Sequence, residues 1–423
     1  MLPDFSSSRA AEREHLPRTP CTSPRSDSPS QAQPGGVRQA ASLARPIERP
    51  LGSPVRILYL IDYYYGTHGG TERQLLELVA NLDRRRFEPR LAVFRPTPFI
   101  EQRGSLPCRV DILSVGRLRS PRTWPRLLQL TRLIRRDGIR LVHIFFNDAA
   151  LAAPPFCRLA RARVVVSRRD LGFWYTGFTL RALRASNCFV DAVIANSKAV
   201  ADNVQRCENL PPDKAVVIYN GHDPARFEQP PLAGFKANFS IPENALIVGS
   251  VGSFYTRKRH RDLIEAFALV RRECRRAHLV LVGSGPERAN LQKLAQAAGV
   301  GGAVSFIEGV SEVVPIVKHF DVGVLCSETE GCSNTLIEYL GCGVPTVCTD
   351  VGGNPEVVAD GVTGLFVSVG DVQGLAQRIC WLLSHRTQAR ALGVSARASI
   401  LDRFTTRRMV ESHIELYERL LTP

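Results

Sequence analysis

The clearest chemical signal in the sequence is a pair of glutamates, Glu330 and Glu338, that stand eight positions apart. The surrounding segment, SETEGCSNTLIEYLGCGVPTVCTD (327–350), predicts a strand, a loop and a helix over Ser333–Cys342, with Gly343 just beyond the helix end. Eight helical residues span about 12 Å. The two carboxylates could therefore bind hydroxyls at both ends of a ligand, while the amino end of the helix binds a phosphate between them. The alternative is that neither glutamate binds a ligand. Glu330 would then only stabilise the positive amino end of the helix, and Glu338 would lie on the surface.

Three further glycine-bearing loops follow predicted strands: GTHGGTE (66–72), GSFYTRKRH (252–260) and VGSGPE (282–287). In the first, Gly69 and Gly70 would let the backbone approach a phosphate before a helix begins. In the second, Arg257 and Lys258 supply positive charge where a phosphate could lie. Taken singly, the glycine pair is as typical of a tight strand-to-helix turn, and the basic loop favours a solvated segment. The third loop, VGSGPE, indicates the fold and not a cofactor.

Alternating strand and helix patterns predict the elements that carry these loops. Buried strands such as VRILYLID (55–62) alternate with amphipathic helices such as TERQLLELVANL (71–82). The pattern predicts two Rossmann-like lobes with parallel sheets, over 55–221 and 245–400, joined by a linker at 222–244 and separated by a cleft. Ligands of such sheets bind beyond the carboxyl ends of the strands, which is where the four loops lie.

The two ends of the chain differ from the lobes in composition. Residues 1–54 are rich in Pro, Ser and Arg, and we expect a disordered tail there because so few apolar residues cannot offset chain entropy. Residues 401–423 predict a C-terminal helix that could cross back to the first lobe. Near the N-terminus there is no apolar segment typical of a secretory signal, so we expect a cytoplasmic protein.

Composition and charge exclude several classes of protein. With 44% hydrophobic and 22% charged residues the chain is too apolar to be disordered as a whole, and no apolar run is long enough for a membrane-spanning helix. The 11 cysteines are scattered without a CxxC pair, which predicts neither a zinc site nor a disulfide framework. The net charge is +15, of which the tail holds +2, so about +13 belongs to the lobes and favours an anionic partner. Nucleic acid is disfavoured, because no recognition element accompanies the charge.

The segment 327–358 resembles the signature of the family 4 glycosyltransferases, and the resemblance extends over roughly residues 55–400. It implies the GT-B fold and transfer of a hexose-type sugar, with retention, from a nucleoside-diphosphate sugar (UDP favoured) to a glycan or lipid-linked acceptor. By motif position Glu338 would hold the ribose hydroxyls, Glu330 would contact the donor sugar, and Lys258, helped by Arg257, would neutralise the diphosphate. Backbone groups would cradle phosphate and sugar around Cys332, Ser333, Asn334 and Thr335. No cofactor or metal is expected, since no Asp-x-Asp motif occurs.

Two departures from the family pattern leave other functions open. Ser253 stands where the family has an arginine, and Arg168-Arg169-Asp170 stands where it often has a histidine. A non-catalytic sugar-nucleotide-binding or partner subunit is therefore one alternative, and a sugar-nucleotide epimerase of the same fold is another. We interpret His143, inside a predicted strand, as a structural histidine, and Cys332 as a residue that is not a nucleophile.

A basic amphipathic segment suggests a further partner, an anionic membrane surface. Residues 117–140 contain eight arginines and one acid, with Trp124 and several leucines among them. The apolar residues would pack on the sheet, and the arginines would either be solvated or contact lipid headgroups. We expect peripheral association with the cytosolic face of a membrane, because enzymes that resemble this one often use lipid-linked acceptors.

Overall fold

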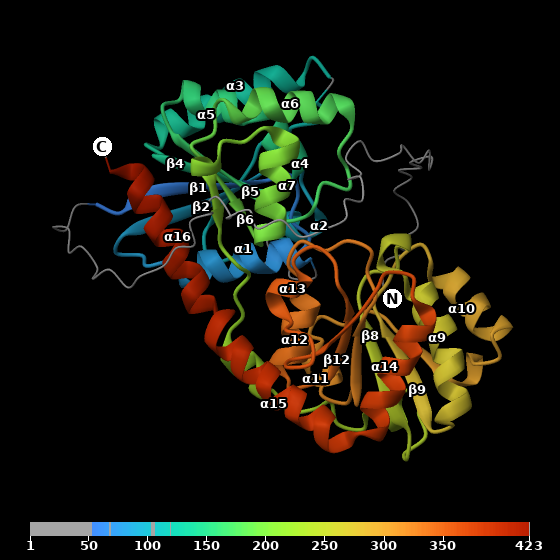
Figure 1. The fold of residues 1–423 in the computed structure, drawn as a ribbon. Helices are drawn as coiled ribbons and strands as arrows, with labels where there is room; N and C mark the ends of the chain where they lie inside the picture. The colour runs from blue at the N-terminus through green and yellow to red at the C-terminus, as the bar shows by residue number, and fades with distance from the viewer. Residues whose placement is uncertain (1–52, 67–68, 103–105, 119, 423) are drawn as a thin grey trace, which may run out of the picture. The chain divides into compact units, whose positions relative to one another are not determined.

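The computed structural model describes residues 53–66, 69–102, 106–118 and 120–422. Apart from residues 53–54, the tail predicted over 1–54 lies outside the described residues. Two parallel sheets with helices on both faces form the described part, as predicted (Figure 1).

The first lobe contains a seven-stranded sheet in the order β3-β2-β1-β4-β5-β6-β7, in which every pair of neighbours is parallel. Its strands are β1 Val55–Ile61, β2 Phe87–Val93, β3 Arg109–Ile112, β4 Leu141–Ile144, β5 Arg163–Arg168, β6 Ala192–Ala195 and β7 Ala215–Val217. Its helices are α1 Gly70–Asn81, α2 Pro98–Glu101, α3 Thr123–Arg136, α4 Asn147–Ala152, α5 Pro154–Leu159, α6 Gly177–Asn187 and α7 Lys198–Glu208.

The second lobe contains a six-stranded parallel sheet in the order β10-β9-β8-β11-β12-β13. Its strands are β8 Leu246–Val251, β9 Ala277–Val282, β10 Val304–Ile307, β11 Val322–Leu325, β12 Thr346–Thr349 and β13 Leu365–Val367. The helices in this half of the chain are α8 Phe235–Asn238, α9 His260–Glu273, α10 Arg288–Ala297, α11 Val314–Val317, α12 Asn334–Gly341, α13 Asn354–Val357, α14 Val372–Ser384, α15 Arg386–Arg403 and α16 Thr406–Leu421.

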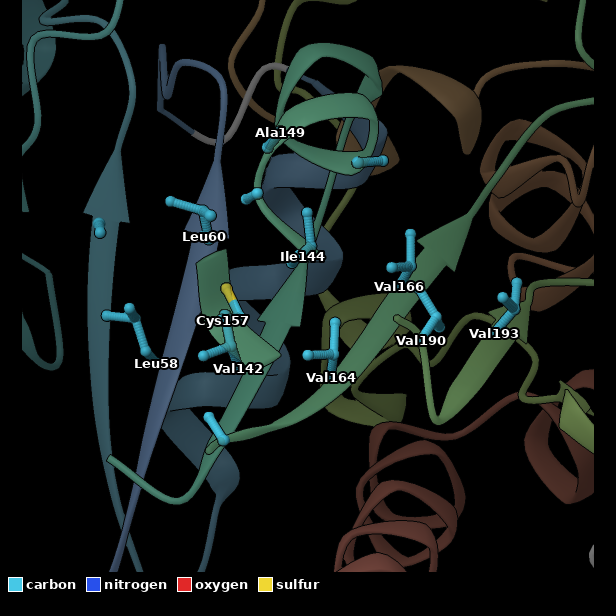
Figure 2. Close-up of a cluster of buried hydrophobic side chains, with 14 of the residues drawn as sticks. Leu58, Leu60, Val142, Ile144, Ala149, Cys157, Val164, Val166, Val190 and Val193 are labelled. Carbon is cyan, nitrogen blue, oxygen red and sulfur yellow. The ribbon is translucent and has the colours of Figure 1, made fainter. Parts of the chain in front are cut away.

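Burial on both faces of the sheet explains why the strands are continuous apolar runs. Along β1, Leu58 and Leu60 face one side and pack with residues of β4, β5 and β6 and with helices α4 and α5 (Figure 2). The alternate residues Ile57 and Tyr59 face the other side and pack against α1 and α16. A strand with water on one face would instead alternate apolar and polar residues.

The last helix, α16, packs on the first lobe although it follows the whole second lobe in the chain (Figure 1). Its Tyr417 is fully buried and its hydroxyl lies 2.7 Å from Nδ1 of His143 on β4, whose Nε2 lies 2.8 Å from Ser167 Oγ. Burial holds the pKa of His143 well below its ordinary value, so the imidazole is neutral. His143 thus lies inside the sheet core with both ring nitrogens bonded.

Candidate active site

A cavity of about 750 Å³ is lined by loops from the carboxyl ends of both sheets. Every residue that the sequence suggested for catalysis or donor binding contributes to its lining: Gly69, Gly70, Arg257, Lys258, Glu330, Cys332, Ser333, Asn334, Thr335 and Glu338. These residues come from three separate segments of the chain. Parallel strands bring them together because their carboxyl ends share one edge of each sheet.

Helix α12 begins at the cavity and has the caps that the sequence predicts. The Ser333 hydroxyl accepts a hydrogen bond from the Leu336 backbone N–H at 3.3 Å, which makes Ser333 the N-cap. Gly343, just past the helix end, has a φ of +72° that suits glycine. Asn334 and Thr335 in the first turn line the cavity, so the partial positive charge of the helix amino end lies at its wall.

Glu330 and Lys258 form an ion pair inside the cavity. Lys258 Nζ lies 2.6 Å from Glu330 Oε1, and the side chains are 21% and 11% exposed. Lys258 ends a 3₁₀ turn, Thr256–Lys258, that follows β8. The sequence suggested both residues but did not predict their pairing. A lysine this close to the carboxylate can also reach a phosphate bound beside the sugar that Glu330 would contact.

Glu338 is buried, and two arginines hold its carboxylate. The alternative considered from the sequence, that Glu338 is a surface residue, is therefore wrong. Arg226 donates a hydrogen bond to Glu338 Oε1 at 2.8 Å, and Arg73 lies 3.5 Å from the same oxygen. Arg226 also pairs with Glu312 at 2.6 Å, and Arg73 lies 3.7 Å from Glu312. Burial would lower the pKa of Arg226, but its bonds to both carboxylates outweigh this effect and raise the pKa. Two arginines shared by two carboxylates fix the Glu338 side chain in one position.

Arg257 is held by aromatic rings. Its guanidinium lies 4.7 Å from the ring centres of both Phe173, from the first lobe, and Tyr255. Ser253 also lines the cavity, at the position where the resemblance would predict an arginine. Arg257 lies four residues after Ser253 in the same loop, and its fixed side chain brings a positive charge to the cavity.

The glycine pair brings the first lobe close to α12. Gly69 is the N-cap of α1, and a side chain on Gly70 would lie 2.6 Å from the Asn334 amide nitrogen. The same amide donates a hydrogen bond to the Gly70 carbonyl at 3.4 Å. A side chain on Gly69 would clash with the Glu72 carboxylate, 1.9 Å away. Glycine at positions 69 and 70 therefore leaves room for the side chains of Glu72 and Asn334, in addition to any approach of a phosphate.

The surroundings of Arg168 and Cys332 indicate structural and not catalytic roles. Arg168, at the end of β5, forms a buried bidentate pair with Glu208 at 2.8 and 2.9 Å. The Cys332 thiol is buried, which raises its pKa to about 12 and keeps it protonated. A protonated thiol is a poor nucleophile, in keeping with the interpretation from the sequence.

Two residues that hold Glu338, Arg73 and Arg226, were not suggested by the sequence, and neither was the contact that Glu356 makes with the first lobe. Glu356 of the second lobe accepts hydrogen bonds from the Lys198 and Ala199 N–H groups at the start of α7, at 2.8 and 2.9 Å. The Tyr219 hydroxyl donates to the same carboxylate at 2.8 Å. Arg226 lies in the segment predicted as an interdomain linker, 222–244, and its local sequence showed no sign of a role in the site.

In the described part of the chain, no three side chains of His, Cys, Asp or Glu gather in a way that could hold a metal ion. Within the same residues, no helix combines the length and apolar character needed to cross a membrane.

Two family models match the chain, one to each lobe. Residues 68–226 match "Glycosyltransferase Family 4", and residues 235–399 match "Glycosyl transferases group 1". Among curated proteins, N-acetyl-alpha-D-glucosaminyl L-malate synthase of Bacillus anthracis is 31% identical over 55% of this chain and 60% of its own length. The lipopolysaccharide core biosynthesis glycosyltransferase LpsE of Rhizobium meliloti is 28% identical over 84% of this chain and 97% of its own. The match to the first of these therefore spans less than two thirds of that relative.

Solved structures share the fold. HepE of Anabaena in complex with UDP has a TM-score of 0.75 and 21% identity, over 86% of this chain and all (100%) of its own. A glycosyltransferase of Rickettsia africae has the same TM-score of 0.75 at 18% identity, over 88% of this chain and 100% of its own. At this identity the similarity shows the fold, which is GT-B, as predicted.

Proposed function

Because this chain belongs to the family 4 glycosyltransferases, we propose that it transfers a hexose-type sugar from a UDP-sugar to a glycan or lipid-linked acceptor, with retention at the anomeric carbon. The observation that carries the proposal is the cavity in which the Lys258–Glu330 pair, the amino end of α12 and the fixed Glu338 carboxylate occur together. Similarity to a UDP complex supports the choice of nucleotide.

In this proposal each group binds a different part of the donor. Glu338, oriented by Arg226 and Arg73, accepts hydrogen bonds from the ribose hydroxyls. Lys258, Arg257 and the amino end of α12 bind the diphosphate and stabilise the negative charge that grows on it as the sugar leaves. Glu330 positions the sugar. These fixed positive groups supply the stabilisation from the protein itself, so we propose that transfer needs no metal ion.

A donor screen tests the proposal directly. We expect a UDP-sugar to raise the melting temperature of the full chain more than the matching GDP- or ADP-sugar does. A ligand at 100 times its dissociation constant stabilises the folded state by about 2.7 kcal/mol. Radiolabel from the bound donor should then appear in an acceptor or as free sugar. Binding without transfer or hydrolysis would indicate a non-catalytic sugar-nucleotide-binding subunit, and no shift with any nucleotide sugar would contradict the proposal.

We also propose that α3 contacts anionic lipid while the enzyme acts on a lipid-linked acceptor. Leu127, Leu130 and Ile134 are buried against the sheet, whereas Trp124 is 59% and Leu128 44% exposed. Exposed arginines share the outer face of the helix with Trp124 and Leu128: Arg122, Arg126, Arg132, Arg135 and Arg136. A basic face with an exposed tryptophan is typical of helices that lie at a membrane interface.

Vesicle flotation checks this contact. The wild-type chain should float with anionic vesicles and not with neutral ones, and less well as salt rises. Changing Arg122, Arg126 and Arg132 to Glu should weaken binding by about 100-fold, since each basic residue contributes about 1 kcal/mol and 1.4 kcal/mol is tenfold. The matched control reverses three exposed arginines of the second lobe, Arg272, Arg275 and Arg276. Equal losses in both triple variants would mean that net charge, not this helix face, drives binding.

A further inference from the structure

Five basic side chains line the cavity among the described residues: Arg73, Arg168, Arg169, Arg257 and Lys258. Three of them are paired with carboxylates and one, Arg257, lies over aromatic rings. Arg169 differs from all four. Its guanidinium donates to the amide oxygen of Asn220, a neutral group, and within the described parts of the chain no carboxylate oxygen lies within 4.0 Å of it.

The position of Arg169 is fixed by its backbone. It follows the end of β5, and its carbonyl accepts a hydrogen bond from the Asn196 side chain at 3.2 Å. The same carbonyl is so close to the second lobe that a side chain on Gly331 would lie 2.3 Å from it. Gly331 is the neighbour of Glu330. Arg169 therefore enters the cavity from the first lobe beside the residue proposed to position the donor sugar.

The charge of Arg169 is only partly compensated. Burial lowers its pKa to about 10, and the nearby Cys332 and Glu72 oppose this shift. The guanidinium stays protonated at neutral pH. Glu72 is itself buried, and burial raises its pKa, so it is a poor permanent counter-ion. A partly buried cation with a neutral hydrogen-bond partner gains most from an anion that a ligand brings.

We infer that Arg169 binds an acidic group of the substrate, a carboxylate or phosphate carried either by the transferred sugar or by the acceptor. The inference rests on the proposed sugar transfer and narrows its substrate class. The guanidinium fork matches either anion with two parallel hydrogen bonds. The donor diphosphate is a less suitable partner, because Lys258, Arg257 and the amino end of α12 already serve it from the second lobe.

Two arms of one kinetic experiment separate the sources of the acidic group. The donor arm compares hydrolysis of UDP-glucuronate and UDP-glucose without acceptor. The acceptor arm uses the donor preferred by the wild type and compares a sugar acceptor on a prenyl diphosphate with the same sugar on a neutral alkyl chain. Both arms use the wild type, R169Q, R169K and the control R181Q, which changes an exposed arginine of α6 in the same lobe.

In the arm whose substrate carries the acidic group that Arg169 binds, we expect R169Q to lower kcat/KM for the acidic substrate by about 10- to 100-fold relative to the neutral one. This is the loss typical of a charged hydrogen bond. R169K should retain part of the preference, and R181Q all of it. Melting temperatures and UDP affinity should stay close to wild type in both Arg169 variants. Equal losses with acidic and neutral substrates in both arms, or weakened UDP binding in R169Q, would overturn the inference. If the wild type binds no nucleotide sugar, the proposed function itself fails, and that result is visible before any Arg169 variant is compared.

Discussion

Replacing Lys258 with alanine is expected to lower the turnover number by about 100-fold, the loss typical of removing one preorganised group that stabilises transition-state charge. The change removes the cation that lies 2.6 Å from Glu330 and leaves that carboxylate, 11% exposed, without its partner. Both effects oppose the growth of negative charge on the departing diphosphate. Initial rates at saturating donor measure the loss.

Two companion variants show whether the effect belongs to the site. K258R keeps the positive charge and should restore part of the rate, whereas K293A, which truncates an exposed lysine of α10, should behave as wild type. Wild-type turnover in K258A would mean that Lys258 does not serve the leaving group. A large fall in melting temperature would instead assign it to the fold.

Replacing Glu338 with glutamine is expected to weaken UDP binding by about 10- to 100-fold. Hydrogen bonds to a charged group contribute about 1.5–3 kcal/mol, and 1.4 kcal/mol corresponds to a tenfold change. The fold should persist, because Arg226 keeps its bidentate pair with Glu312 and glutamine fills the same volume. Calorimetric titration of UDP measures the change.

Pyrophosphate provides the matched ligand for this test, since it has no ribose. Its affinity should be nearly the same in the wild type and in E338Q. If UDP and pyrophosphate lose affinity equally, Glu338 acts through the charge of the phosphate site and not through the ribose hydroxyls.

Local sequence patterns were sufficient to predict the strands and helices that carry the site residues. Helix α12 was expected over Ser333–Cys342 and is Asn334–Gly341, because caps at both ends depend only on neighbouring residues. The two-lobed parallel fold was predicted for a similar reason. Apolar runs without alternation arise when helices cover both faces of a sheet, as the buried side chains of Leu58 on one face of β1 and Ile57 on the other show.

No local sequence pattern predicted which side chains from distant parts of the chain form pairs. Arg73, Arg226, Glu312 and Glu338 come from four separate segments and meet only in the folded chain. The cap that Glu356 supplies to α7 joins residues 158 positions apart. A charged residue on a helix or in a loop has the same local pattern whether it is solvated or paired, so these contacts could be seen only in the structure. The roles assigned to the site residues remain predictions for the variants above.

The return of α16 to the first lobe has a consequence for the order of events during biosynthesis. Residues of α16, among them Met409, Val410, Leu416 and Tyr417, complete a core whose other residues come from the first lobe, mainly from its β-strands and α1. A ribosome makes those strands long before it makes α16, because the entire second lobe is translated in between. The part of the first sheet's face that α16 covers, beside α1, must therefore stay exposed while the second lobe emerges, at a stage when exposed apolar surface promotes aggregation. During translation the nascent first lobe is thus a natural client for chaperones, and the second lobe can complete its own core first.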